Sequence, residues 1–392
     1  MLVSTSTAKN KRAVRIIVII GNTSQKQWLT VARLWDGHYL AFPQVGGYRE
    51  RVDLKAEEVG MRCRVMFVGL CVCIVGLWSV DAALAQDGWT APRNAEGQPD
   101  LSGIWANNSA TPLQRPEQLA GKVELSDEEL AELNSKIQAF RDAEQAGDLL
   151  GDRLIQQALG DSEYQDFDVV TGNYNAFWLV ERELDRRTSL IVDPADGRIP
   201  SLTARAQELA AERRAYSAAH PSDGPEDRNL GDRCLHFAAP RIGSGYNSYM
   251  QILQTQSHVA IFQEMGHQVR TIPLTTHPHI DDDIRQWVGD ARGRWEGETL
   301  VVETRNYSAE TRFNGASENL HLIERYTRIS PDVLKHEITL NDPDTWTSPW
   351  TVELLHTSTR DPIFEYACHE GNYSMPGILG GARLDEQQGG GE

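Results

Sequence analysis

Cysteine is scarce in this chain, and several common catalytic signatures are missing. Only five cysteines occur in 392 residues, and three of them fall within one apolar stretch at residues 63–73. The chain has no Gly-x-Ser-x-Gly elbow, no phosphate-binding glycine loop, no His-Glu-x-x-His helix and no dinucleotide fingerprint. These absences argue against the common hydrolases and the common nucleotide-dependent redox enzymes.

An export signal begins at an internal methionine, Met61. A basic start is followed by an almost unbroken apolar run at 65–80, and Ala83-Leu84-Ala85 then places small residues where a signal peptidase cuts. The run is shorter than the roughly 20 residues that a membrane span needs, which favours cleavage over anchoring. We therefore predict a signal peptide at 61–85 and a periplasmic or secreted mature protein.

The stretch before this signal, residues 1–60, conflicts with normal cleavage, because a signal peptide is N-terminal in the translated chain. The simplest interpretation is that translation starts at Met61 and that residues 1–60 are a mis-annotated N-terminal extension. Its apolar run at 16–20 has no matching turn or cap pattern, so we exclude the extension from the predicted fold.

The mature chain, residues 86–392, is strongly acidic. Residues 1–85 hold 11 of the 38 Lys and Arg residues and 6 of the 56 Asp and Glu residues, which leaves 27 basic and 50 acidic side chains in the mature part. Its formal charge of −23 over 307 residues repels phosphate backbones and anionic lipid. We predict no nucleic-acid partner, and no stable membrane span after signal cleavage.

Two cysteines remain after cleavage, Cys234 and Cys368. In an oxidising compartment two such cysteines most often form one disulfide, and we predict that bridge. The alternative is a zinc site made by the two cysteines with His236 and His369, although the spacings match no known zinc module.

The part of the mature chain before residue 249 mixes helices with short strands. A capping box at Ser126-Asp-Glu-Glu129 begins the first helix, and a proline at 200 begins the second. The predicted elements are strands at 100–105, 175–180 and 189–192 and helices at 126–146 and 200–219.

From residue 249 onward the pattern changes to strands at short intervals, separated by glycine and proline turns. Alternating apolar residues along 334–340 and 350–356 predict one buried and one solvated face, as in an antiparallel sheet. The candidate strands are 249–255, 259–264, 268–274, 299–304, 321–329, 333–340, 350–357 and 363–369.

The predicted fold is therefore mainly β. We expect an antiparallel meander that closes as a lipocalin-like barrel, or folds as a sandwich, with two helices inserted before the meander. This makes residues 86–392 a single mature domain with a helical insertion at about 126–219.

Four motifs form a distinctive set and carry a resemblance. They are Pro99-Asp-Leu-Ser-Gly-Ile-Trp105, Arg285-Gln-Trp-Val-Gly-Asp290, Gly293-Arg-Trp-Glu-Gly-Glu-Thr-Leu-Val-Val-Glu-Thr304 and Glu365-Tyr-Ala-Cys-His-Glu-Gly-Asn-Tyr373. With them the chain resembles a large family of exported bacterial proteins of unassigned function, over about residues 92–383. The glycine-tryptophan start and the meander resemble lipocalin-like barrels more weakly. The resemblance implies no particular chemistry, and His277 stands where it leads us to expect an arginine.

Glu264, His267 and Arg270 lie around one predicted turn and are our candidates for catalysis. Histidine titrates near neutral pH, a carboxylate can orient its ring, and an arginine can hold an anionic group by paired hydrogen bonds. The alternative is a hairpin turn with ordinary surface charges.

Aromatic and polar residues late in the chain are the candidate substrate-binding groups. Aromatic side chains suit a small apolar or aromatic ligand, and the polar cluster after residue 365 ends the last predicted strand, where a barrel has its mouth. The alternatives are an aromatic core and a strand end held by the disulfide. The candidates are Trp287, Trp295, Tyr366, His369, Glu370, Asn372 and Tyr373.

His277-Pro-His279 and the three aspartates at 281–283 are the most metal-like string, because imidazoles and carboxylates bind zinc. A solvated acidic loop is the interpretation that we prefer. We accordingly predict neither a metal site nor a cofactor.

Three strands carry titratable residues among apolar ones. Glu324 and Arg325 are neighbours on one strand, so they face opposite sides and only one of them can point into a barrel. His336 and His356 lie on apolar faces, where hydrogen-bonded core histidines are more common than catalysts.

Together these observations predict an exported β-barrel enzyme that acts on a small apolar or aromatic molecule by cofactor-independent acid–base chemistry of the lyase or isomerase type. A non-catalytic periplasmic binding or carrier protein is the alternative, and a structural envelope protein with a filled barrel is a third hypothesis. A histidine and a carboxylate together in an apolar pocket would favour the enzyme.

Overall fold

The computed structural model describes two parts of the chain separately. The first comprises only the strands at 16–22, 25–33 and 39–41, and the predicted signal peptide at 61–85 lies outside the described residues, as do 175–179 of one predicted strand. The second part comprises residues 89–142, 153–160, 180, 182–237, 239–244 and 246–389.

The first part is a small antiparallel sheet in the order β1-β2-β3. Its strands are β1 (Ile16–Asn22), β2 (Gln25–Arg33) and β3 (Tyr39–Ala41). The sequence predicts no helix or strand here, so this sheet was not expected. The interpretation of residues 1–60 as an untranslated extension stays a prediction.

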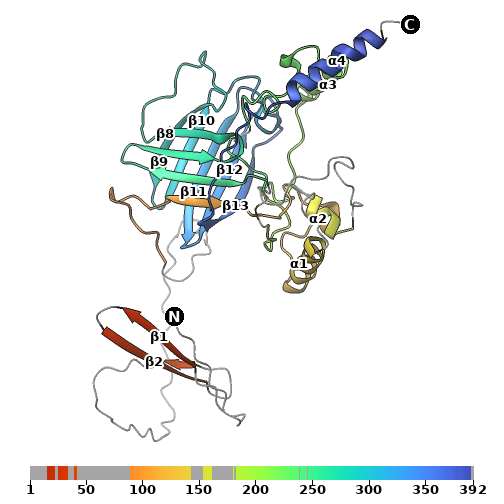
Figure 1. The fold of residues 1–392 in the computed structure, drawn as a ribbon. Coiled ribbons are helices and arrows are strands. Elements are labelled where there is room, and N and C mark those ends of the chain that lie inside the picture. The colour runs from red at the N-terminus through yellow and green to blue at the C-terminus, as the bar shows by residue number, and fades with distance from the viewer. Residues whose placement is uncertain are drawn as a thin grey trace, which may run out of the picture. The chain divides into compact units, whose positions relative to one another are not determined.

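The second part is built around a nearly closed nine-strand antiparallel barrel, as predicted (Figure 1). Its strands follow the order β8-β7-β6-β4-β13-β12-β11-β10-β9, and a bridge from Leu274, just after β8, to Gly293 in the middle of β9 connects the two outermost strands. The barrel strands are β4 (Gly103–Ala106), β6 (Tyr249–Gln254), β7 (His258–Gln263), β8 (Gln268–Pro273), β9 (Asp290–Glu296), β10 (Thr299–Arg305), β11 (His321–Ser330), β12 (Val333–Asn341) and β13 (Trp350–Thr359).

Two short early strands pair with the meander far along the chain. β4 lies between β6 and β13, so this early strand joins the first and last strands of the meander. β5 (Ile191–Asp193) pairs with β13 beside β4. The Trp105 indole Nε1 donates to the Leu101 carbonyl at 2.9 Å, which anchors the buried ring at this junction.

The helices before the meander begin at side-chain caps. At the start of α1 (Asp127–Asp142), the Glu129 amide donates to Ser126 Oγ at 3.3 Å and the Ser126 amide donates to the Glu129 carboxylate at 2.9 Å, which confirms the predicted capping box. α3 (Ala204–Ala219) begins after its N-cap Thr203, a few residues later than predicted. A short helix, α2 (Arg153–Ala158), packs with α1 around a small apolar cluster.

The predicted last strand at 363–369 is wrong. Two backbone donors of this segment are used by side chains, because the Phe364 amide donates to Glu264 Oε1 at 3.1 Å and the Tyr366 amide donates to His267 Nδ1 at 3.4 Å. A turn follows, and the chain ends in the unpredicted helix α4 (Ser374–Gly389). The strand β9 was also not predicted.

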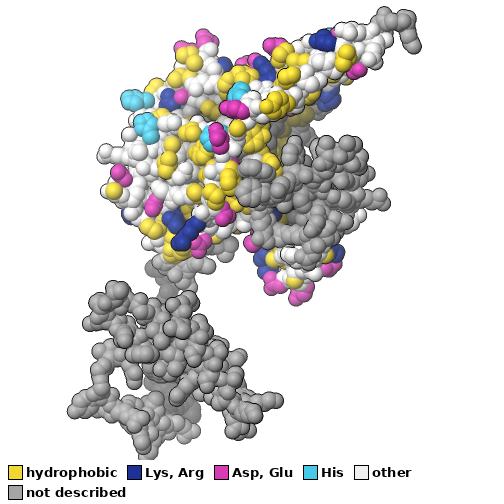
Figure 2. Space-filling view, viewed as in Figure 1, with side chains coloured by type: hydrophobic (Ala, Val, Ile, Leu, Met, Phe, Trp, Pro, Cys, Tyr) yellow, Lys and Arg dark blue, Asp and Glu magenta, His cyan; other side chains and the backbone are white. Residues whose placement is uncertain are grey.

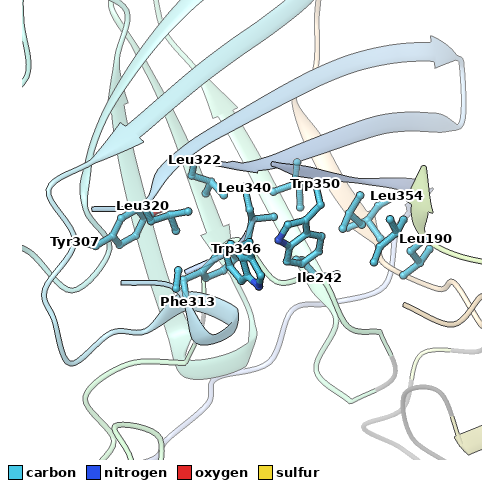
Figure 3. Packing of buried hydrophobic residues seen from close by; sticks show 14 residues of the cluster. Leu190, Ile242, Tyr307, Phe313, Leu320, Leu322, Leu340, Trp346, Trp350 and Leu354 are labelled. Atoms are coloured by element: carbon cyan, nitrogen blue, oxygen red, sulfur yellow. The ribbon is translucent and has the colours of Figure 1, made fainter. Parts of the chain in front are cut away.

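Strict alternation along β12 and β13 buries every second side chain, as predicted. At one end of the barrel the buried residues form a cluster that we call the tryptophan cluster (Figure 3). The rings of Trp346 and Trp350 meet edge to face there, with centroids 5.4 Å apart. The cluster also contains Leu190, Ile191, Ile242, Tyr307, Phe313, Ala316, Leu320, Leu322, Ile338, Leu340, Val352 and Leu354.

One glycine of the sequence motifs has a clear steric role. Gly289 has φ of +67°, and a Cβ atom added there would lie 2.6 Å from the Arg305 carbonyl oxygen. Only glycine fits this turn without displacing the backbone of β10.

No helix in the part of the chain that the structure describes is long and apolar enough to cross a membrane. On the described surface that Figure 2 shows, acidic and basic side chains are interspersed with hydrophobic ones.

Candidate active site

A band of polar side chains lies inside the barrel next to the tryptophan cluster. Along β12 the buried residues are Leu334, His336, Ile338 and Leu340, so the histidine is flanked by apolar residues on the same face. The same alternation buries polar side chains on β8, β11 and β13. We call this set the polar layer: Arg270, Glu324, Tyr326, His336 and His356.

The centre of the polar layer is an ion pair between Arg270 and Glu324. Arg270 Nη1 donates to Glu324 Oε1 at 3.0 Å and Nη2 donates to Oε2, while the Tyr326 hydroxyl donates to Oε1 at 2.6 Å. The side chains are 5% and 0% exposed. Burial alone would raise the pKa of Glu324, but the Arg270 charge and the hydrogen bonds outweigh it and hold that pKa well below its usual value. Glu324 is therefore a carboxylate at neutral pH.

His336 connects this carboxylate to a second histidine. Its Nε2 lies 3.2 Å from Glu324 Oε1 and its Nδ1 lies 3.3 Å from His356 Nε2. The ring stacks on Tyr326 with centroids 4.0 Å apart, which holds its plane. Burial lowers the pKa of His336 and, further, that of His356, so both rings are neutral at neutral pH.

The hydrogen-bonding chemistry assigns the tautomers of the two rings. Because the Glu324 carboxylate only accepts, His336 Nε2 carries the proton and donates to it. The neutral His336 then accepts at Nδ1 from the protonated Nε2 of His356. Nδ1 of His356 is left as a lone-pair acceptor, and this buried atom has no hydrogen-bond partner among the described residues.

His356 also lines a cavity of about 30 Å³ inside the barrel. This volume holds one or two water molecules or a small reacting group of a ligand. Met250, Ile261 and Pro240 supply apolar walls, and Arg241, Asn107 and Gln263 supply polar ones. Two histidines and two arginines therefore line a partly apolar cavity, and the Glu324 carboxylate contacts one residue of each kind without lining the cavity itself.

Of the three predicted catalytic residues, only Arg270 belongs to this arrangement. Arg270 points into the barrel and is engaged by Glu324, whereas Glu264 is buried near the start of β6 and accepts from the amides of Tyr249 and Phe364. Burial raises the pKa of Glu264 against those backbone hydrogen bonds. His267 is exposed, and its ring packs edge to face on Phe262 with centroids 4.7 Å apart. Among the described contacts, none joins the side chains of this trio.

Two of the predicted substrate-binding residues line a common hollow. Tyr366 and Asn372 border an open polar groove of about 800 Å³ together with both half-cystines. Tyr366 packs edge to face on Phe237, with centroids 5.2 Å apart.

The other predicted substrate-binding residues are dispersed. His369 and Glu370 are exposed, and Tyr373 is 83% exposed. Trp287 lies in a loop at the surface, whereas Trp295 packs against the apolar core of the barrel.

Cys234 and Cys368 lie at disulfide-bonding distance, with their sulfur atoms 1.99 Å apart. This is the predicted bridge, and it ties the turn before α4 to the loop after α3. Sulfur atoms joined in a disulfide cannot serve as thiolate ligands, so the alternative zinc site lacks its sulfur donors.

The metal-like string is used for local contacts. His279 Nδ1 lies 2.9 Å from an Asp290 carboxylate oxygen, and Asp290 also accepts from Arg292 at 2.6 Å. Within the described residues, no three His, Cys, Asp or Glu side chains converge as a metal site would require.

The polar layer contains residues that the sequence analysis treated as structural. Glu324 faces the interior and Arg325 faces outward to Glu296. This confirms the prediction that the two residues face opposite sides of their strand. His336 and His356 lie on the buried faces as predicted. One sequence signal could have revealed the polar layer. His336 and His356 lie at inward-facing positions of two neighbouring strands, and Glu324 lies at an inward-facing position of the strand before them.

Comparisons of the chain with family models, with curated proteins and with solved structures find no match.

Proposed function

We propose that the protein is an exported β-barrel enzyme that performs cofactor-independent acid–base chemistry, of the lyase or isomerase type, on a small apolar or aromatic molecule. The observation that carries this proposal is the chain Glu324–His336–His356, which ends at a cavity-lining histidine whose Nδ1 has no partner among the described residues. A base oriented through a second group by a carboxylate is the usual arrangement for proton transfer in enzymes.

His356 is the base in this proposal, in place of His267. Its Nδ1 accepts a proton from a carbon of the substrate, and the positive charge that develops is stabilised through His336 by the Glu324 carboxylate. Returning the proton to another atom of the same molecule completes an isomerisation. Delivering it to a leaving group completes an elimination, and neither step requires an electron acceptor.

The apolar cavity walls support an apolar substrate. Met250 and Ile261 lie on the same side of the barrel as the histidines, while the small volume admits only the reacting end of the molecule. The body of the ligand then lies at the mouth, between the cavity and the loop that contains Pro240 and Arg241.

Export is part of the same proposal. The cysteine pair at disulfide-bonding distance suits an oxidising compartment, in agreement with the predicted signal peptide. We also propose that the chain belongs to the exported bacterial family that its motifs resemble. Trp105 and Gly289, two residues of those motifs, have the structural roles described above.

A catalytic base can be detected without knowing the product of the reaction. In heavy water it exchanges carbon-bound hydrogen of the substrate for deuterium, and NMR measures this exchange. We expect the purified protein to catalyse exchange or conversion in a panel of small aromatic and aliphatic carbonyl compounds. The variant His356→Gln should lower the rate by roughly 10²- to 10⁴-fold, the usual contribution of one positioned acid or base.

His267→Gln is the matched control, since it removes an exposed histidine and should leave the rate unchanged. Equal activity of the His356→Gln variant would contradict the assignment of the base. Binding of panel members without exchange or conversion would favour the carrier protein, the alternative function that the same cavity supports.

A further inference from the structure

The cavity beside His356 holds more unsatisfied polar groups than its small size would suggest. Three buried side-chain atoms of its lining have no hydrogen-bond partner among the described residues: Asn107 Oδ1, Arg270 Nε and His356 Nδ1. Buried polar atoms are normally paired, because an unmade hydrogen bond costs free energy. Two of these atoms are acceptors and one is a donor, so the one or two water molecules that the cavity can hold would pair with them.

Arg241 brings an unneutralised charge to the lining of this cavity. Arg270 lines the same cavity but forms an ion pair with Glu324 through both terminal nitrogens, whereas Arg241 forms no ion pair with any described carboxylate. Its Nε donates to the Gly243 carbonyl at 3.1 Å, which orients the guanidinium group. Its two terminal nitrogens have no hydrogen-bond partner in the described part of the chain.

The surroundings of Arg241 make the lack of an ion pair unusual. The side chain is partly buried, and burial lowers its pKa to about 10, so the guanidinium group is still charged at neutral pH. Glu264 is the carboxylate that influences it, but the oxygens of Glu264 accept from backbone amides instead. No described carboxylate forms an ion pair with Arg241, and its partly buried guanidinium group is therefore able to bind an anion.

We infer that Arg241 binds a carboxylate group of the ligand, so the substrate class is a small monocarboxylate with an apolar body. A planar guanidinium group pairs with a carboxylate through two parallel hydrogen bonds. Glu264 lies close enough to influence Arg241, which disfavours a doubly charged group such as phosphate. The inference rests on the proposed function, because it assigns a substrate to the same cavity.

This arrangement gives the proposed reaction its geometry. The carboxylate is held at the mouth by Arg241, and the adjoining carbon enters the cavity toward Nδ1 of His356. A proton on a carbon near the carboxylate is therefore the one presented to the base. The sequence predicts the anion-binding role for Arg270, but in the structure Arg270 forms an ion pair with Glu324.

Binding of matched ligand pairs tests the inference. Calorimetry would compare butyrate with butyramide, benzoate with benzamide, and phenyl phosphate as the dianionic probe, at one ionic strength. We expect the wild-type protein to bind each carboxylate at least tenfold more tightly than its amide and more tightly than the phosphate. Arg241→Gln should abolish the preference for carboxylate.

Arg205→Gln is the matched control, because Arg205 is exposed on α3 and lines neither cavity described above. It should retain the full preference. If Arg241→Gln does not fold, Arg241→Lys replaces it, and we expect the preference to fall several-fold because an ammonium group cannot make the paired contact. An unchanged preference in the folded variant, or equal affinity of the wild type for acid and amide, would overturn the inference.

The His356→Gln variant separates this inference from the proposed function. It should keep the preference for carboxylate while losing hydrogen exchange. Tight, Arg241-dependent binding with no turnover by the wild-type protein would sustain the carboxylate site and reject the enzyme. Turnover that depends on His356 but not on Arg241 would do the reverse.

Discussion

The polar layer and the tryptophan cluster occupy the same barrel interior but are built from opposite chemistry. On β12, His336 belongs to the first and Leu340 to the second, and the two side chains are separated along one buried face by Ile338 alone. The tryptophan cluster is stabilised by loss of water from apolar surface. The polar layer depends instead on pairing every charge that it buries. Alternation thus decides which side chains face inward, whereas the partners across the barrel decide whether a charge is tolerated there.

The largest expected effect concerns the ion pair. Glu324→Gln leaves the Arg270 guanidinium buried without a counter-ion, and we expect it to lower the free energy of unfolding by about 3–5 kcal/mol. Chemical denaturation measures this value. Arg325→Gln, at the adjacent outward-facing position, is the control and should change it by no more than about 0.5 kcal/mol. Similar values for the two variants would show that the polar layer is not held by this pair.

A smaller effect is expected in the tryptophan cluster. Leu340 is fully buried, so Leu340→Ala should lower the free energy of unfolding by about 2–4 kcal/mol through lost burial and the cavity left behind. The same measurement applies. Leu253→Ala removes a leucine that is 52% exposed on β6 and should have little effect. A cost for Leu340→Ala as small as that of the control would mean that the cluster is loosely packed.

The smallest expected effect of a single residue is on the pH dependence of the free energy of unfolding, which involves histidines of the polar layer but no residue of the tryptophan cluster. Burial lowers the pKa of His336 and His356, and that of His236 to about 4, so the folded protein resists protonation that the unfolded chain accepts below about pH 6.5. The free energy of unfolding should therefore fall as the pH is lowered from 7 to 5, by up to about 2 kcal/mol for each of these histidines, because about 1.4 kcal/mol is lost per pH unit below 6.5.

Denaturation at several pH values checks this expectation. His356→Gln should reduce the slope because it removes one of the titrating groups, whereas Leu340→Ala should leave it unchanged. Stability from Glu324 has the same sign but is lost only at lower pH, as the pH falls through its depressed pKa. A slope that does not respond to His356→Gln would indicate that this ring is not buried in the neutral form.

Much of the fold was predictable because it depends on local pattern. The meander strands, the capping box and the inward-facing side of β12 and β13 follow from period-two alternation and from hydrogen bonds between residues close in sequence. The predicted strand at 363–369 failed for a non-local reason. Side chains of Glu264 and His267, about a hundred residues earlier, accept hydrogen bonds from its amides.

The candidate site was predicted only in part. Arg270 was selected as a charged functional residue, but its partner Glu324 lies 54 residues away and His336 a further 12. Spacing along the chain does not by itself determine which side chains meet across a barrel, because the pairing of the strands must also be known. The sequence analysis therefore grouped Arg270 with its neighbours Glu264 and His267, whereas the structure groups it with residues of β11 and β12.

By itself, the sequence determined the mainly-β class, the alternation that sorts side chains to the two faces of each strand, and the pairing of the last two cysteines. These depend on composition and on short-range periodicity. Only the tertiary structure decided that Glu324, His336 and His356 form one connected chain, and that Arg241 faces their cavity without a counter-charge among the described residues. Barrel closure brings distant strands together, and the energy of a buried charge depends on those distant neighbours.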